Sequence, residues 1–237
     1  MKLRVVKKRF FTWLPMSLIL LGIFLLMISF GPLIRDEVWF YFKEMKEQEF
    51  VLVANEDLAN KGDTVRDSIF ARYLSSKPIR IEPVSKDFGL VIERIGVNVP
   101  VVKDVSVTDE VAYSEALKYG VAHSLTSGYP SRKPGNVYIF AHASLNFWKL
   151  GEYATVFNLL RKLDPGDKVH VFYEGDAYVY SVINIEKVKG WDTYPLTRPV
   201  IEPLLTLQTC DPPGTTLNRL VVTAKLADFI AGNPDDE

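Results

Sequence analysis

The chain has 237 residues, 48% of them hydrophobic, and its 28 Lys and Arg nearly balance 29 Asp and Glu, for a net charge of −1. Without the five basic residues that precede position 10, 23 Lys and Arg remain against 29 Asp and Glu, a net charge of −6. This mild acidity excludes the basic surface by which proteins bind nucleic acids. The length suits one domain of about 150 residues plus additional segments.

An apolar segment at residues 14–34 contains no ionisable side chain. As an α-helix rising about 1.5 Å per residue, it would cross a hydrocarbon core of roughly 30 Å. The residues before it include Lys and Arg but no Asp or Glu, and such an excess predicts a cytoplasmic flank. We therefore expect a basic cytoplasmic tail at 1–13, a single transmembrane helix at 14–34, and the rest of the chain outside the cytoplasm.

A cleaved signal peptide is the alternative interpretation of this segment. Its apolar region would be about 7–15 residues long and would end at a small-x-small cleavage site. The flank here reads Gly31-Pro32-Leu33-Ile34-Arg35, without such a site. An uncleaved anchor is therefore favoured.

The residues after the apolar segment change character twice. Residues 35 to about 60 mix aromatic and charged side chains without Gly or Pro, which favours a juxtamembrane helix. Residues 61–86 contain Gly62, Pro78 and Pro83 and have no sustained periodicity, which is typical of a tether. We assign 35–86 to a helix and tether that connect the anchor to a folded domain.

From residue 87 the sequence consists of short strands separated by turn residues, a pattern typical of a β-barrel or β-sandwich. The predicted strands are 89–95, 99–105, 136–141, 168–173, 178–189, 204–209 and 220–226. Helical patterns occur at 109–118 and 153–163. We therefore predict a mainly β domain with short helices at 87–230, followed by a C-terminal tail at 231–237.

Cys210 is the only cysteine, so it cannot form an intramolecular disulfide. Outside the cytoplasm cysteines usually pair, and an odd one indicates an intermolecular bridge or a free reactive thiol. A small buried hydrophobic side chain is the alternative, because free cysteines are among the most buried residues.

Three histidines are available as partners for this thiol. His142 and Cys210 each directly follow a predicted strand, so both belong at the rim of a barrel, where a rigid scaffold could hold a base beside a nucleophile. His123 falls in a predicted loop. His170 alternates with apolar residues and is predicted to face solvent from its strand.

Arg219 begins the predicted strand that follows Cys210, nine residues later. If the two strands pair, its guanidinium returns to the rim close to the thiol. There it would stabilise a thiolate or the oxyanion of a tetrahedral intermediate. A solvated arginine at a strand end is the alternative.

Five stretches match one family. They are VIERIGVNVPVV at 91–102, GVAH at 120–123, PGNVYIFAH at 134–142, TLQTC at 206–210 and RLVV at 219–222. Together they resemble the opening strand pair, the Gly-x-x-His … Gly-Asn … Gly-His block and the Thr-Leu-x-Thr-Cys … Arg signature of sortases. Sortases are membrane-anchored cysteine transpeptidases of bacterial surfaces, and the resemblance covers roughly residues 88–227.

The resemblance implies a closed eight-stranded sortase-type β-barrel and a role for each candidate residue. Cys210 would be the nucleophile and His142 the general acid and base. Arg219 would stabilise the oxyanion or position the substrate, and Thr209, beside the nucleophile, would help to bind substrate. No cofactor is expected, and no acidic cluster indicates the calcium site that some sortases have.

Two positions depart from the family pattern. Ala141 replaces the glycine usually found before the catalytic histidine, and Ala143 replaces an arginine often found after it. Both leave the sortase class and the sorting motif open. His123 matches a recurrent position that is not catalytic.

By resemblance, the substrates are exported proteins with a C-terminal sorting motif, LPxTG-like, and the acceptor is an amine of a cell-wall precursor or a pilin lysine. Two alternatives stay open. A cell-envelope cysteine peptidase would use the same Cys–His pair with water as acceptor. A non-catalytic anchored binding domain would keep Cys210 buried.

Overall fold

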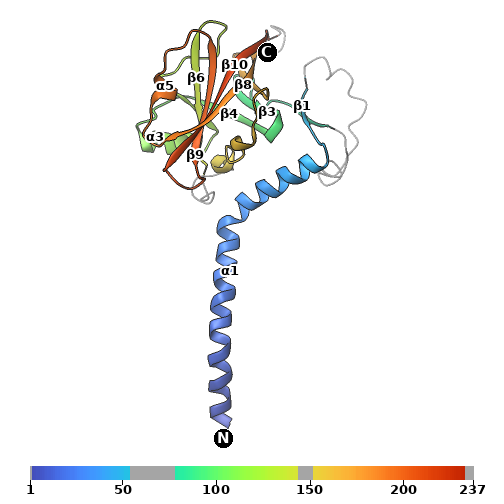
Figure 1. Ribbon diagram of the computed structural model, residues 1–237, viewed down its shortest axis with the longest axis vertical. Coiled ribbons are helices and arrows are strands. Elements are labelled where there is room, and N and C mark those ends of the chain that lie inside the picture. Colours follow the sequence, from blue (N-terminus) through green and yellow to red (C-terminus); the bar gives the residue numbers. More distant parts are fainter. Residues whose placement is uncertain (1, 54–77, 144–151, 233–237) are drawn as a thin grey trace.

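The computed structural model describes residues 2–53, 78–143 and 152–232 (Figure 1). Its elements are a long N-terminal helix, a small two-stranded sheet and a closed β-barrel with short helices between its strands. Most of the predicted C-terminal tail, residues 233–237, lies outside the described residues.

Helix α1 (Lys2–Met45) contains the apolar segment but bends within it (Figure 1). No single helix of the described residues is long and apolar enough to cross a membrane; Pro15–Gly31 and Ile34–Met45 reach that length and composition only as a pair, bent by 59°. Pro32 falls between these two parts, and a proline inside a helix lacks the backbone N–H that a regular helix uses as a donor. The expectation of one transmembrane helix at 14–34 is therefore not confirmed.

The second half of α1 packs against the barrel domain. Phe40 is buried in the main hydrophobic core. The Nζ of Lys43 donates to the carbonyl oxygen of Arg94 at 2.5 Å, and Glu37 forms an ion pair of 2.9 Å with Lys162. This half of the helix is thus part of the folded domain.

The predicted juxtamembrane helix ends earlier than residue 60. After α1 ends at Met45, β1 (Phe50–Leu52) pairs in parallel with β2 (Ile79–Ile81). Apolar, aromatic and β-branched residues such as those of both segments favour a pleated, half-buried strand, which accounts for the difference. The rest of the predicted helix and most of the tether, residues 54–77, lie outside the described residues.

The predicted eight-stranded barrel is confirmed: it closes in the order β10-β8-β7-β3-β4-β5-β6-β9. In chain order its strands are β3 (Phe88–Ile92), β4 (Val97–Val105), β5 (Val121–Ser124), β6 (Gly135–Phe140), β7 (Lys168–Tyr173), β8 (Asp176–Lys189), β9 (Pro203–Asp211) and β10 (Asn218–Ile230). Pairs β4–β5 and β6–β9 are parallel, and the other neighbours are antiparallel. Because β6 and β9 are parallel, they end at the same rim of the barrel.

Short helices connect the strands. They are η2 (Glu93–Ile95), α3 (Glu110–Ala116), η3 (Glu152–Thr155), η4 (Leu160–Lys162) and α5 (Tyr194–Thr197). Helix α3 confirms the predicted helix at 109–118, and Asp109 caps it by accepting two backbone N–H bonds. The single helix predicted at 153–163 is wrong. Four consecutive residues there, 157–160, are buried, which a helix with one apolar face cannot achieve.

His170 is buried, with 7% of its surface exposed, and does not face solvent as predicted. It lies opposite Val91 in the β3–β7 register. Val91 and Phe172 form a second buried cluster with Ile81 of β2, against which residues of β1 also pack. The small β1–β2 sheet therefore covers the outer face of β3 and β7, on the strand where His170 was predicted to face solvent.

Candidate active site

Cys210 and Arg219 meet across the β9–β10 pair. The antiparallel register places them directly opposite each other, and Nη1 of Arg219 donates to Sγ of Cys210 at 3.4 Å. Strand β9 continues to Asp211, so the half-buried Cys210 is the second-last residue of the strand and does not follow it as the sequence had predicted. A guanidinium in this position stabilises negative charge on the sulfur, or on an oxygen attached to an attacked carbon.

His142 reaches the same rim from β6. In the parallel β6–β9 register Phe140 lies opposite Gln208, and the N–H of Ala141 donates to the Gln208 carbonyl at 3.2 Å. Strand β6 ends at Phe140, so the chain that continues to His142 leaves it beside the part of β9 that leads to Cys210. Strand pairing thus brings the segments that carry the histidine and the thiol to the same rim of the barrel.

Tyr113 of α3 fixes the imidazole from the side. Its hydroxyl oxygen lies 3.1 Å from Nδ1 of His142, and the two rings make an edge-to-face contact with centroids 4.9 Å apart. Among the residues that the structure describes, the buried Nε2 of His142 has no hydrogen-bond partner. Tyr113 therefore occupies Nδ1 and leaves Nε2 as the ring nitrogen without a partner among these residues.

Burial sets the protonation of both groups. It lowers the pKa of His142, so the imidazole is neutral at pH 7. Burial also raises the pKa of Tyr113, and negative charge on Cys210 raises it further, so the phenol keeps its proton. The site accordingly holds a neutral base, a neutral phenol and a fixed positive charge on Arg219.

Thr209 lies beneath this rim. Its side chain is 3% exposed, and its hydroxyl donates to the carbonyl of Ala141 at 2.9 Å. This bond joins the residue before Cys210 to the residue before His142. Any part of Thr209 in substrate binding would therefore act through the position of these two segments.

Of the three residues predicted to carry the chemistry, Cys210 and Arg219 are in direct contact, and the segment that holds His142 reaches the same rim. Tyr113 was missed. It belongs to none of the motifs, and the sequence predicted its helix without indicating which face would dock on β6. Its only signal was a large aromatic residue in a short helix otherwise composed of small, acidic and aliphatic residues.

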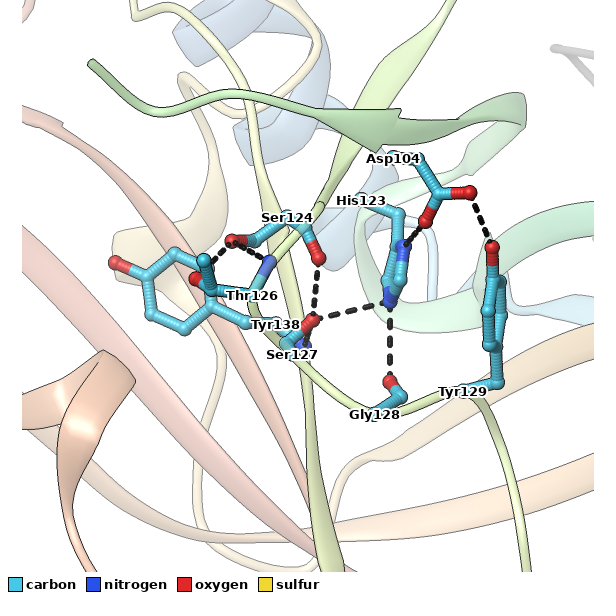
Figure 2. A network of polar contacts seen from close by, with 8 residues as sticks. All are labelled: Asp104, His123, Ser124, Thr126, Ser127, Gly128, Tyr129 and Tyr138. Carbon is cyan, nitrogen blue, oxygen red and sulfur yellow. Dashed lines mark hydrogen bonds and ion pairs between the residues drawn. The ribbon is translucent and has the colours of Figure 1, made fainter.

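His123 belongs to a separate network (Figure 2). It lies in β5 and not in a loop as predicted. The strand was missed because all four of its residues are buried, so that its sequence has no alternating pattern. Its Nε2 is 3.0 Å from both the Gly128 carbonyl and the Ser127 hydroxyl, and its Nδ1 is 3.7 Å from Asp104. The Tyr129 hydroxyl donates to the same carboxylate at 2.6 Å. These contacts hold the loop after β5 in place.

Within residues 2–53, 78–143 and 152–232, no group of three or more His, Cys, Asp or Glu side chains could hold a metal ion.

The sequence and the fold of this chain match those of known proteins. A family model described as the Sortase domain matches residues 90–227. Sortase C-1 from Actinomyces oris is 29% identical, with a TM-score of 0.51, over 61% of this chain and 76% of that one. Sortase C from Streptococcus pneumoniae is 22% identical, with a TM-score of 0.52, over 71% and 78%.

Sortase A from Listeria monocytogenes, 18% identical with a TM-score of 0.51, shares the fold over 62% of this chain and 91% of that one. A comparison with functionally curated proteins gives no match. The family model nevertheless covers more than half of the chain, over the segment that carries the thiol, the histidine and the arginine. The chain belongs to the sortase family of cysteine transpeptidases.

Proposed function

We propose that this sortase cleaves a C-terminal sorting motif of exported proteins through a thioacyl-enzyme and transfers the acyl group to an amine. The observation that carries the proposal is the strand register, which pairs Cys210 with Arg219 and brings the strand that precedes His142 to the same rim. A nucleophile, a base and an anion-stabilising cation at one rigid rim are the groups that acyl transfer needs.

In the acylation step, His142 takes the thiol proton at Nε2 and the Cys210 sulfur attacks the peptide carbonyl carbon. The guanidinium of Arg219 faces the negative charge of the tetrahedral intermediate. The imidazolium then gives its Nε2 proton to the departing amine as the C–N bond breaks. The products are a thioester on Cys210 and the released C-terminal fragment.

In the transfer step, an incoming amine attacks the thioester. His142 accepts a proton from this amine, and the thiolate leaves and is protonated in turn. The free energy of the peptide bond is thus conserved in the thioester and returned to a new amide. We propose an LPxTG-like motif as donor, and a cell-wall precursor amine or a pilin lysine as acceptor.

The proposed location is the outer face of the cell membrane. The apolar part of α1 would anchor the chain with the basic residues 1–13 in the cytoplasm, as the charge distribution indicates. The packing of residues 34–45 against the barrel would then keep the catalytic domain close to the bilayer.

The test uses the full chain in detergent micelles, wild type beside Cys210→Ala, with a library of sorting-motif peptides and an amine acceptor. Mass spectrometry of the products should show amine adducts with the wild type and none with the variant. Ligated product from Cys210→Ala would refute the mechanism. Cleavage that is insensitive to added amine would favour the peptidase alternative, and an unreactive thiol with no product would favour the binding domain.

A further inference from the structure

Tyr113 contacts the candidate general base although it lies about a hundred residues from the nucleophile in the sequence. Its ring stacks on Phe140 of β6, with centroids 5.3 Å apart and planes inclined by 11°, and meets the His142 ring edge-on. Its hydroxyl is 3.1 Å from Nδ1. Helix α3, capped by Asp109, thus delivers a single polar atom to one side of the imidazole.

We propose that Tyr113 is a positioning residue whose hydroxyl oxygen accepts the Nδ1–H of His142 and holds the imidazole in the tautomer that exchanges protons at Nε2. This inference rests on the proposed function, since it assigns a part in the same acyl transfer. It extends that function to a residue outside the motifs that identify the family.

The proton transfers at Nε2 determine which partner donates in this hydrogen bond. To take the thiol proton, Nε2 must offer a lone pair, so the neutral ring must carry its proton on Nδ1. After that transfer the imidazolium carries protons on both nitrogens, and it returns the Nε2 proton to the leaving amine. Nδ1–H is present throughout, and an acceptor beside it stabilises both states. A phenol that donated to Nδ1 would place the proton on Nε2 and block the first step.

The hydrogen bond to the Tyr113 hydroxyl is the main interaction around His142 that would stabilise its protonated form. Tyr113 on α3 is the titratable group that the structure places in contact with the ring, and Cys210 on β9 and Arg219 on β10 are near enough to that tyrosine to shift its pKa. Burial, which lowers the pKa of His142, is opposed by no carboxylate that the structure places against the ring. Loss of the hydroxyl should therefore lower that pKa further and weaken the ring as a base.

The test compares wild type, Tyr113→Phe and the control Tyr119→Phe as full chains in detergent micelles. Tyr113→Phe retains the ring that stacks on Phe140, so its melting temperature should stay close to that of the wild type. Tyr119 is 65% exposed, and among the described residues its hydroxyl donates a hydrogen bond only to Glu115, at 3.5 Å, so its replacement should change nothing. Each protein is assayed for ligation from pH 5 to 9, with ¹⁵N NMR of labelled histidine.

We expect Tyr113→Phe to lower kcat about tenfold with little change in KM, and to shift the pH limb that reports His142 toward lower pH. The ¹⁵N shifts of His142, assigned with His142→Gln, should indicate a protonated Nδ1 in the wild type and a mixture of tautomers in Tyr113→Phe. An unchanged rate, pH profile and tautomer in Tyr113→Phe would overturn the inference and leave the proposed function intact. Ligation by Cys210→Ala would instead overturn the proposed function.

Discussion

Replacing Thr209 with valine should both destabilise the barrel and slow catalysis. The substitution nearly preserves the shape of the side chain but removes the hydroxyl that donates to the Ala141 carbonyl at 2.9 Å. A buried acceptor left without its donor costs about 1–3 kcal/mol. For a domain of this size that corresponds to a fall in melting temperature of roughly 3–10 °C. Activity should fall as well, because Ala141 directly precedes His142.

The assay is thermal unfolding of the full chain together with ligation kinetics at a temperature where every variant is folded. Thr209→Ser retains the hydroxyl and should recover most of both losses. Thr197→Val is the matched surface control, because the hydroxyl of Thr197 is exposed and bonds only within its own short helix. It should stay within about 0.5 kcal/mol of the wild type. A Thr209→Val protein as stable and active as the wild type would refute this reasoning.

Two further predictions concern charge. Arg219→Lys keeps the positive charge but loses the planar fork of donors. Ligation should therefore fall at least about tenfold, while the rate at which iodoacetamide alkylates Cys210 should change less than about threefold. Equal losses in both assays would contradict a role at the oxyanion. Burial lowers the pKa of His142, so as the pH falls this histidine becomes protonated in the unfolded chain before it does in the folded chain. The free energy of unfolding should therefore decrease as the pH drops through about 6.5. His142→Gln should reduce the difference in melting temperature between pH 7.5 and pH 5, and an undiminished difference would count against the buried neutral imidazole.

The strands of the barrel and the candidate residues at its rim were predictable because the patterns that indicate them lie within short stretches of the sequence. Alternating strands bounded by turn residues predicted a barrel or a sandwich, and the sortase resemblance implied the closed barrel. The short connection between Cys210 and Arg219 allowed their strands to pair without requiring it. His142 was placed at the rim by the end of its strand. Parallel pairing of β6 with β9, which brings the ends of these two strands to the same rim, required the complete topology.

The features that sequence reasoning missed depend on contacts between distant segments. Strand β5 lacks an alternating pattern because all of its residues are buried, so His123 was assigned to a loop. His170 is buried because β1 and β2 cover the outer face of its strand. Tyr113 meets His142 only because α3 docks on the side of β6. No pattern within a single segment reports such docking.

The most direct test of the central claim is to trap the acyl-enzyme on the full chain. The protein would be incubated with a sorting-motif peptide without acceptor, digested and analysed by mass spectrometry, before and after treatment with hydroxylamine. We expect an added acyl mass on the peptide that contains Cys210, removed by hydroxylamine and transferred to a product when an amine acceptor is supplied. An acyl group on another residue, or ligated product from a chain without the Cys210 thiol, would contradict it.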